Sequence, residues 1–155
     1  MKNDVAVLLG SSSDRHYIEP SLEYYKYFNI RVEVHVMSAH RNPDDVISFA
    51  KNARDNGYKI LVGCAGMAAH LAGVLKANSI LPVIGVPLPG GIQDGIDSLL
   101  ATVQMPKGVP VATMSVGKSG AINAAVLCAE ILSLSNKSIE KTLLKFKKNS
   151  CVISD

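Results

Sequence analysis

The sequence predicts an α/β protein of three layers (α/β/α), with helices on both faces of a central parallel sheet and a further helix at the C-terminus. Short β-rich runs alternate with amphipathic stretches of helical length, which is the order of elements in such sheets. Several of these runs are almost continuously apolar, as strands buried on both faces are. The 155 residues are 48% hydrophobic and 19% charged, which fits a single folded domain, residues 1–155, and argues against disorder.

Five stretches are expected to form the strands, and spacing predicts the first helix between them. The strands are expected at residues 5–9, 31–37, 59–64, 82–86 and 109–114. Apolar residues recur at helical spacing after the first strand and predict the inner stripe of a helix, formed by Ile18, Leu22, Tyr25 and Phe28.

The second helix is predicted by its capping residues. Asn42 is expected to be the N-cap, where its side chain would accept an unpaired N–H, and Pro43 suits the first helical position because it has no N–H to lose. Asp44 and Asp45 follow in the first turn, where the helix dipole favours carboxylates. Gly57 is expected to end this helix.

The remaining helices are expected over residues 68–76, 97–103 and 119–134. The last of these is apolar on every side, and a helix of that kind is buried all round. Because one small sheet cannot cover it completely, we infer a subunit interface and therefore a homo-oligomer. Residues from about 135 to 155 are expected to form a peripheral C-terminal helix and tail.

Charge, cysteines and hydropathy exclude several classes of protein. The formal charge is +3, and the lysines between residues 137 and 148 have a single aromatic residue, Phe146, among them, so they favour a solvated helix face over nucleic-acid binding. Cys64, Cys128 and Cys151 form no CxxC pair, which argues against a metal site or a redox dithiol. Reduced thiols, no secretory signal pattern and no apolar run of ~20 residues predict a cytoplasmic protein that does not enter a membrane.

The chemistry is expected in the loops that follow the strands, because ligands of parallel α/β sheets gather at the carboxyl ends of strands. The loop after the first strand offers three hydroxyls, those of Ser11, Ser12 and Ser13, together with free N–H groups at a helix N-terminus, and these can cradle a phosphate. Asp14 is better placed to accept hydrogen bonds from sugar hydroxyls. A plain turn and helix cap explains the same residues equally well.

The loop after the second strand carries the residues with the most reactive side chains. It contains Ser38 and Ala39, followed by His40 and Arg41. An arginine can hold a phosphate through two parallel N–H bonds, and a histidine can carry a proton either way near neutral pH. Two such groups side by side favour a functional site over a simple strand end.

The loop after the third strand is built from small residues. Gly66 and Ala68 would let the backbone approach a ligand closely. His70, expected two residues into the next helix, fits pocket lining and a structural role equally well, and Cys64 is expected to be a core thiol rather than a nucleophile. After the fourth strand, the Pro- and Gly-rich loop of residues 87–95 is long enough to fold over a bound substrate.

Six segments in one order resemble a known enzyme family. They are GSSSD at 10–14, SAHRNP at 38–43, AGMAAHL at 65–71, DSLLATVQMP at 97–106, GVPVAT at 108–113 and GAINAA at 120–125. Over residues 5–134 they resemble the N5-carboxyaminoimidazole ribonucleotide mutase family (PurE) of purine biosynthesis. The resemblance implies a flavodoxin-like or Rossmann-like fold and an octamer that needs no metal, ATP or organic cofactor.

The resemblance also implies an activity and assigns residues to it. Enzymes of this family move a carboxylate from the exocyclic N5 of an aminoimidazole ribonucleotide to ring carbon 4. His40 would then be the general acid and base, and Ser11, Asp14 and Arg41 would bind the small-molecule nucleotide. The remaining residues expected to contact substrate are Ser13, Ser38, Ala39, Gly66, Ala68, His70 and Leu71.

Two alternatives remain, and a few positions depart from the family pattern. Cys64 and Met67 stand where glycines are expected, and Ala72 stands where proline is usual. A related carboxylase would use free carbon dioxide and the unmodified ribonucleotide, but members of that branch tend to carry lysine after the histidine. A non-catalytic nucleotide-binding module would not need His40.

Overall fold

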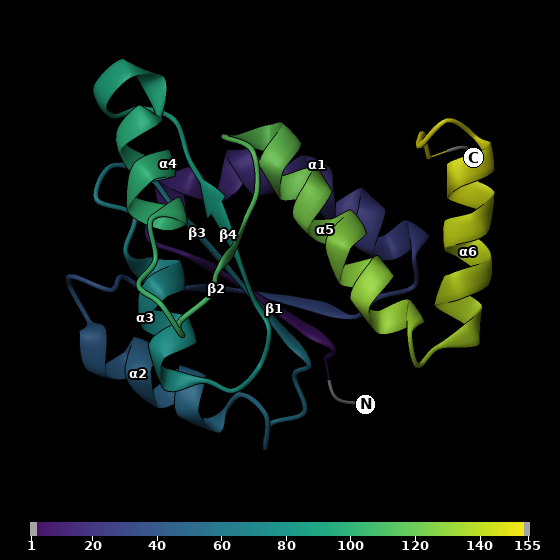
Figure 1. The fold of residues 1–155 in the computed structure, drawn as a ribbon, viewed down its shortest axis with the longest axis horizontal. Coiled ribbons are helices and arrows are strands. Elements are labelled where there is room, and N and C mark those ends of the chain that lie inside the picture. The colour runs from purple at the N-terminus through teal and green to yellow at the C-terminus, as the bar shows by residue number, and fades with distance from the viewer. Residues whose placement is uncertain (1–2, 154–155) are drawn as a thin grey trace.

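The computed structural model describes residues 3–153 and contains a five-stranded parallel sheet in the order β2-β1-β3-β4-β5 (Figure 1). The strands are β1 (Val5–Leu9), β2 (Val32–Val36), β3 (Ile60–Ala65), β4 (Val83–Pro87) and β5 (Ala112–Thr113). One face of the sheet is covered by α1 (Arg15–Tyr27), α5 (Lys118–Ser133) and α6 (Lys137–Lys148). The other is covered by α2 (Pro43–Asn52), α3 (Leu71–Asn78) and α4 (Ile96–Val103). The predicted three-layer fold is confirmed.

Two hydrophobic cores lie on the two faces of the sheet, and β1 contributes to both. Val5, Val7 and Leu9 pack into the core that is shared with α1, α5 and α6. Ala6 and Leu8 pack into the core on the side of α2 and α3. Successive side chains of a strand point to opposite faces, so a strand buried on both sides must be apolar at every position. This explains the uninterrupted apolar run from which the strand was predicted.

The fifth strand is shorter than predicted. Of residues 109–114, only Ala112–Thr113 pair with β4, in the register Ile84↔Ala112 and Gly85↔Thr113. β5 lies at the edge of the sheet, and Pro110 has no N–H to donate to a strand ladder. The apolar run of this segment is therefore longer than the part of it that is hydrogen-bonded to β4.

Helix α2 starts where it was predicted to start, but not for the predicted reason. The side chain of Asn42 does not cap the helix; its Oδ1 accepts the N–H of Ser38 at 2.8 Å, and its Nδ2 donates to Asp45 at 2.9 Å. The side chain thus closes the preceding loop onto the first turn of the helix. The prediction that Gly57 ends the helix was also wrong: α2 ends at Asn52, and Gly57, with φ of 99°, closes the turn that follows.

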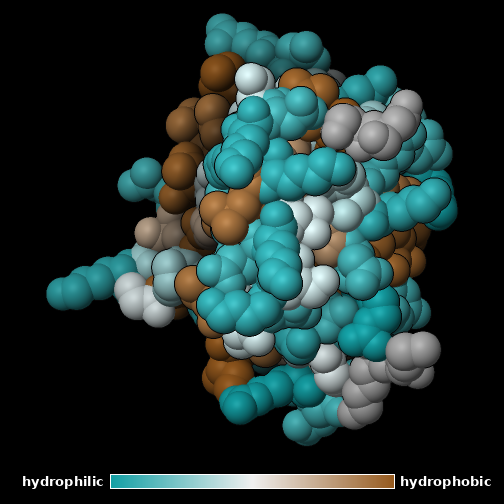
Figure 2. Space-filling view, turned by 90° about the vertical axis from the view of Figure 1, so that its right-hand side faces the viewer, coloured by the Kyte–Doolittle hydropathy of each residue, from teal (hydrophilic) through white to brown (hydrophobic). Residues whose placement is uncertain are grey.

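The apolar character of α5 is largely satisfied inside the chain. Helix α6 packs beside it and buries Ile139, Leu143 and Phe146 in the same core, where the ring of Phe146 lies 5.3 Å from that of Phe28. The apolar pattern of α5 therefore does not by itself require a partner subunit. The outer side of α6 is mostly hydrophilic (Figure 2), as the lysine pattern predicted. Among the described residues, no helix has both the length and the apolar character needed to span a bilayer.

A buried carboxylate joins three strands at the end of the sheet opposite the predicted site. Asp4 accepts hydrogen bonds from Arg31 at 3.0 Å and from Lys59 at 2.9 Å, so it links the start of β1 to the segments that lead into β2 and β3. Burial opposes ionisation of Asp4, but the hydrogen bonds and charges of Arg31 and Lys59 outweigh it and lower its pKa below 3.8.

Asp4→Asn is expected to lower the free energy of unfolding by about 1.5–3 kcal/mol at pH 7, the usual effect of hydrogen bonds to a charged group. Because the pKa of Asp4 is lowered in the folded state, its contribution is present above pH 3.8 and disappears as the pH falls through the folded-state value. Urea unfolding at pH 7 and at pH 3 measures both effects. Glu130→Gln, which removes an exposed ion pair with Lys147, is the control and should change stability by less than about 1 kcal/mol. An equal loss at both pH values for Asp4→Asn would contradict this account.

Candidate active site

The loop that leaves β1 is held by its own serines. The hydroxyl of Ser11 accepts the N–H of Ser13 at 3.3 Å and lies 2.8 Å from the hydroxyl of Ser13. This caps the short 3₁₀ helix η1 (Ser12–Asp14), and α1 begins at the next residue. The serines of this loop therefore do act as a turn and helix cap, one of the two roles that the sequence left open. The same turn also lines the pocket described below.

Asp14, at the end of this turn, is a carboxylate with few donors around it. Burial raises its pKa, although the hydroxyl of Ser13, the backbone hydrogen bond with Ser11 and the nearby His16 act in the opposite direction. Additional hydrogen-bond donors would stabilise the ionised form of a half-buried carboxylate in this environment. It is therefore suited to accept hydrogen bonds from the hydroxyls of a ligand.

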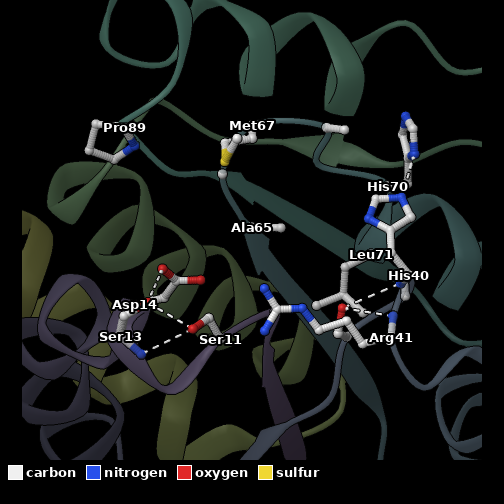
Figure 3. Close-up of a pocket in the computed structure, with 16 residues that line it drawn as sticks. Ser11, Ser13, Asp14, His40, Arg41, Ala65, Met67, His70, Leu71 and Pro89 are labelled. Atoms are coloured by element: carbon white, nitrogen blue, oxygen red, sulfur yellow. Dashed lines mark hydrogen bonds between the residues drawn. The ribbon is translucent and has the colours of Figure 1, made fainter.

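The loop after β2 is shaped by Ser38. Its hydroxyl accepts the N–H groups of His40 at 3.3 Å and Arg41 at 3.2 Å, while its own N–H is held by Asn42. The loop is thus tied at both ends, which fixes the backbone of the two reactive residues. In Figure 3 the guanidinium of Arg41 extends into the pocket on the side where Asp14 and Ser11 lie.

His40 contacts a second histidine. Its Nε2 lies 3.0 Å from Nδ1 of His70, and the two rings meet nearly at right angles, with centroids 5.1 Å apart. In this contact one ring nitrogen donates and the other accepts, and the tautomers of the two rings decide which does which. The role of His70, which the sequence left open, is therefore tied to His40.

The loop after β3 differs from the prediction at its helix. Helix α3 begins at Leu71 rather than at residue 68, so His70 precedes the helix instead of lying two residues inside it. The reason lies in residues 67–70, where the N–H groups of Ala69 and His70 bond to the carbonyls of Met67 and Ala68, two residues back, and so form turns tighter than a helix. Gly66 lies close to the loop after β4, since a Cβ there would lie at contact distance, 3.4 Å, from the backbone oxygens of Leu88 and Pro89.

These three loops surround a cavity of about 480 Å³ at the carboxyl ends of β1, β2 and β3. In the order β2-β1-β3-β4-β5 the chain changes direction across the sheet between β1 and β3, which is where ligands of such sheets bind. The catalytic and substrate-binding residues assigned from the resemblance all line this cavity, namely Ser11, Ser13, Asp14, Ser38, Ala39, His40, Arg41, Gly66, Ala68, His70 and Leu71. Ser12, the third hydroxyl of the predicted phosphate cradle, is not among the lining residues. The volume falls within the range of small-ligand pockets.

The cavity has further lining residues that the sequence reasoning did not select. They are Gly10, Ala65, Met67, Pro89 and Gly90. Pro89 and Gly90 belong to the loop that was expected to fold over a substrate, which could have singled them out. Met67 did carry a signal, because it stands where the family pattern has glycine and its bulk was expected near the pocket wall, although it was not assigned to substrate binding.

Cys64 takes no part in the chemistry of the pocket. Its side chain is buried in the core, and burial raises its pKa far above the usual range for a thiol, with a smaller effect from Asp14. It is therefore a core thiol, as predicted. Within residues 3–153, no group of three or more His, Cys, Asp or Glu side chains is placed to hold a metal ion.

Comparison with known proteins matches almost the whole chain. The sequence pattern of the AIR carboxylase family matches residues 4–151. The N5-carboxyaminoimidazole ribonucleotide mutase of Escherichia coli K12 is 43% identical over 144 residues, which cover 93% of this chain and 85% of the relative. That of Bacillus subtilis is 43% identical over 146 residues, 94% of this chain and 90% of the relative. Among solved structures, PurE of Treponema denticola superposes with a TM-score of 0.85 at 26% identity, over 96% of this chain and 92% of that chain.

Proposed function

The chain belongs to the AIR carboxylase family, and we propose that it is an isomerase of purine biosynthesis. The reaction is the conversion of N5-carboxyaminoimidazole ribonucleotide to 4-carboxy-5-aminoimidazole ribonucleotide. The observation that carries this proposal is the pairing of His40 and Arg41 in one nucleotide-sized cavity, with Ser11 and Asp14 across from them. The substrate comes from the resemblance to the named mutases.

The cavity offers a separate group for each part of a ribonucleotide. Arg41 can hold the phosphate through parallel N–H bonds, and the serines at the start of η1 can donate to the same phosphate. Asp14, whose pKa is raised by burial, can accept hydrogen bonds from the ribose hydroxyls. These assignments leave the base near Gly66, Ala68 and the His40–His70 pair.

His40 supplies the proton transfers of the reaction. As imidazolium it donates a proton to the carbamate nitrogen; the nitrogen–carbon bond breaks, its electron pair stays on nitrogen, and carbon dioxide is released inside the cavity. Ring carbon 4 then attacks the carbon dioxide, and the proton displaced from that carbon returns to His40. The proton given in the first step is recovered in the last, so substrate and product are isomers.

His70 acts on the reaction through His40. Its Nδ1 lies 3.0 Å from Nε2 of His40 and holds that ring in one orientation. It is therefore a positioning residue. A general acid and base in the right place contributes about 10²–10⁴-fold to the rate, and confinement of the carbon dioxide beside its acceptor supplies a further part through proximity.

Turnover of the N5-carboxylated substrate in the absence of ATP and of added carbonate tests the proposal. Formation of the 4-carboxylated product, followed by ultraviolet absorbance, supports the mutase. If turnover requires the unmodified ribonucleotide and rises with added bicarbonate, the protein is a carboxylase. Binding of the nucleotide without turnover would identify a non-catalytic nucleotide-binding module.

We also propose that the enzyme works in the cytoplasm as a homo-oligomer, with an octamer as the expected state. Ile96, Leu100 and Val103 lie exposed at helical spacing on α4, with exposed fractions of 44%, 58% and 47%, and Ile92, which is 71% exposed, lies in the short 3₁₀ turn before this helix. A stripe of this kind is typical of a surface that another protein covers. A second copy of the chain is its expected partner.

Leu100→Glu is expected to lower the sedimentation coefficient of the protein towards that of a smaller assembly, because it places a charge in the centre of this stripe. Leu144→Glu, at a residue 60% exposed on the outer side of α6, is the matched control and should leave the coefficient unchanged. Sedimentation velocity at micromolar concentration measures both. A wild-type protein that sediments as a monomer would refute the assembly.

A further inference from the structure

Met67 adopts a backbone conformation that its side chain does not favour. Its φ is +54°, in the left-handed region that glycine enters freely and a residue with a Cβ does not. Residues held in this way are concentrated at functional sites. The conformation turns the chain sharply between the end of β3 and His70, and it decides where the methionine side chain points.

The side chain lies on the rim of the pocket rather than in the core. Met67 is 66% exposed and lines both the main cavity and a neighbouring hollow, shared with Ile92 and Asp97. In Figure 3 its thioether extends into the pocket between Pro89 and His70. The rim is open on this side, since a Cβ built on Gly90 would have no atom within 4 Å.

We propose that Met67 closes the cavity over the reacting base and retains the carbon dioxide released there. The inference rests on the proposed function. Carbon dioxide is small and uncharged, so neither Arg41 nor the serines of η1 can hold it through charge, and only walls can keep it beside ring carbon 4. Methionine suits this position, because its side chain is unbranched, flexible and apolar, and its sulfur packs well against a flat ring.

Loss of carbon dioxide from the pocket has a defined chemical outcome. The carbamate nitrogen has already taken a proton from His40, so departure of the gas leaves unmodified aminoimidazole ribonucleotide, and His40 regains its proton from solvent. Each enzyme-catalysed decarboxylation therefore ends either as the 4-carboxylated product or as the unmodified ribonucleotide. The leak ratio, the second divided by the first, measures how well the pocket retains the gas.

The test uses substrate labelled with ¹³C in its carboxylate, with an excess of unlabelled bicarbonate in solution. Chromatography gives the leak ratio after subtraction of the enzyme-free reaction, and mass spectrometry gives the label retained in the product. Met67→Gly and Met67→Ala are expected to raise the leak ratio by about fivefold or more, because both remove the apolar cover. Met67→Leu keeps an apolar side chain of similar size and should stay within about twofold of the wild type.

The variants separate the side chain from the backbone. Glycine relieves the left-handed conformation and alanine does not, so a similar leak from both assigns the effect to the missing side chain. Asn29→Gly makes the same backbone change at φ of 55° in an exposed turn away from the pocket, and it should leave the leak ratio unchanged. A leak ratio unaltered in the Gly and Ala variants would overturn the proposal. So would a rise matched by a change in sedimentation coefficient, which would assign Met67 to subunit contacts.

Failure of the proposed function gives a different result. If wild-type protein neither converts nor decarboxylates the N5-carboxylated substrate, the mutase assignment fails and the role of Met67 fails with it. If the wild type isomerises the substrate with its label retained, the mutase stands whatever the Met67 variants do.

Discussion

His40→Asn is expected to lower turnover of the N5-carboxylated substrate by at least about 10²–10⁴-fold, the contribution of a positioned general acid and base. Asparagine can still form hydrogen bonds in the pocket but cannot carry a proton between nitrogen and carbon. Nucleotide affinity should stay within about tenfold, because the phosphate and ribose groups are held by other residues. Steady-state kinetics and calorimetric titration measure the two quantities.

His70→Asn distinguishes the two rings of the pair. If His70 positions His40 through the 3.0 Å contact, its loss should leave measurable turnover and change the pH profile of kcat. The His40→Asn variant should show no residual turnover with such a pH profile. Retained turnover in His40→Asn would refute its assignment as the acid and base, and equal losses in the two variants would contradict the division of roles.

Arg41→Ala is expected to weaken substrate binding by about 1.5–3 kcal/mol, the usual value of hydrogen bonds to a charged group. This corresponds to a rise in Kd of about 10- to 150-fold. The guanidinium enters the cavity opposite the start of η1, so the group it holds should be the phosphate. Titration with the substrate and with its dephosphorylated form measures this: the wild type should prefer the phosphorylated form strongly, and the variant should have lost most of that preference.

Arg54→Ala is the control for this experiment. Arg54 is an exposed arginine that follows α2, away from the cavity, and its removal changes the net charge of the protein by the same amount. Its substrate affinity should equal that of the wild type. If the wild type binds the dephosphorylated form as tightly as the phosphorylated one, Arg41 is not the phosphate ligand.

The sheet and its order of elements could be predicted because strands buried on both faces must be apolar at every position. β1 was therefore predicted with its observed bounds, Val5–Leu9. The pocket could also be predicted, because the carboxyl ends of parallel strands meet at one edge of the sheet. Ser11, His40 and Gly66 come from three loops after three adjacent strands, and the strand order alone brings them together.

Other features depend on contacts between residues far apart in the sequence, which periodicity and capping rules do not contain. The contact between His40 and His70 requires the register of β2, β1 and β3 and the early turn at Met67. The bonds of Asn42 to Ser38 and Asp45 replaced the predicted helix cap, because two polar partners competed for one side chain.

The sequence by itself determined which segments become strands and which loops carry chemistry. Both follow from local composition and from the burial of apolar residues on the two faces of the sheet. The tertiary structure decided that α6 covers α5, that the exposed apolar stripe lies on α4 instead, and that Met67 stands at the open rim of the pocket. These outcomes depend on the packing of whole elements against one another. The free energy of that packing is shared among many distant side chains, so no single stretch of sequence records it.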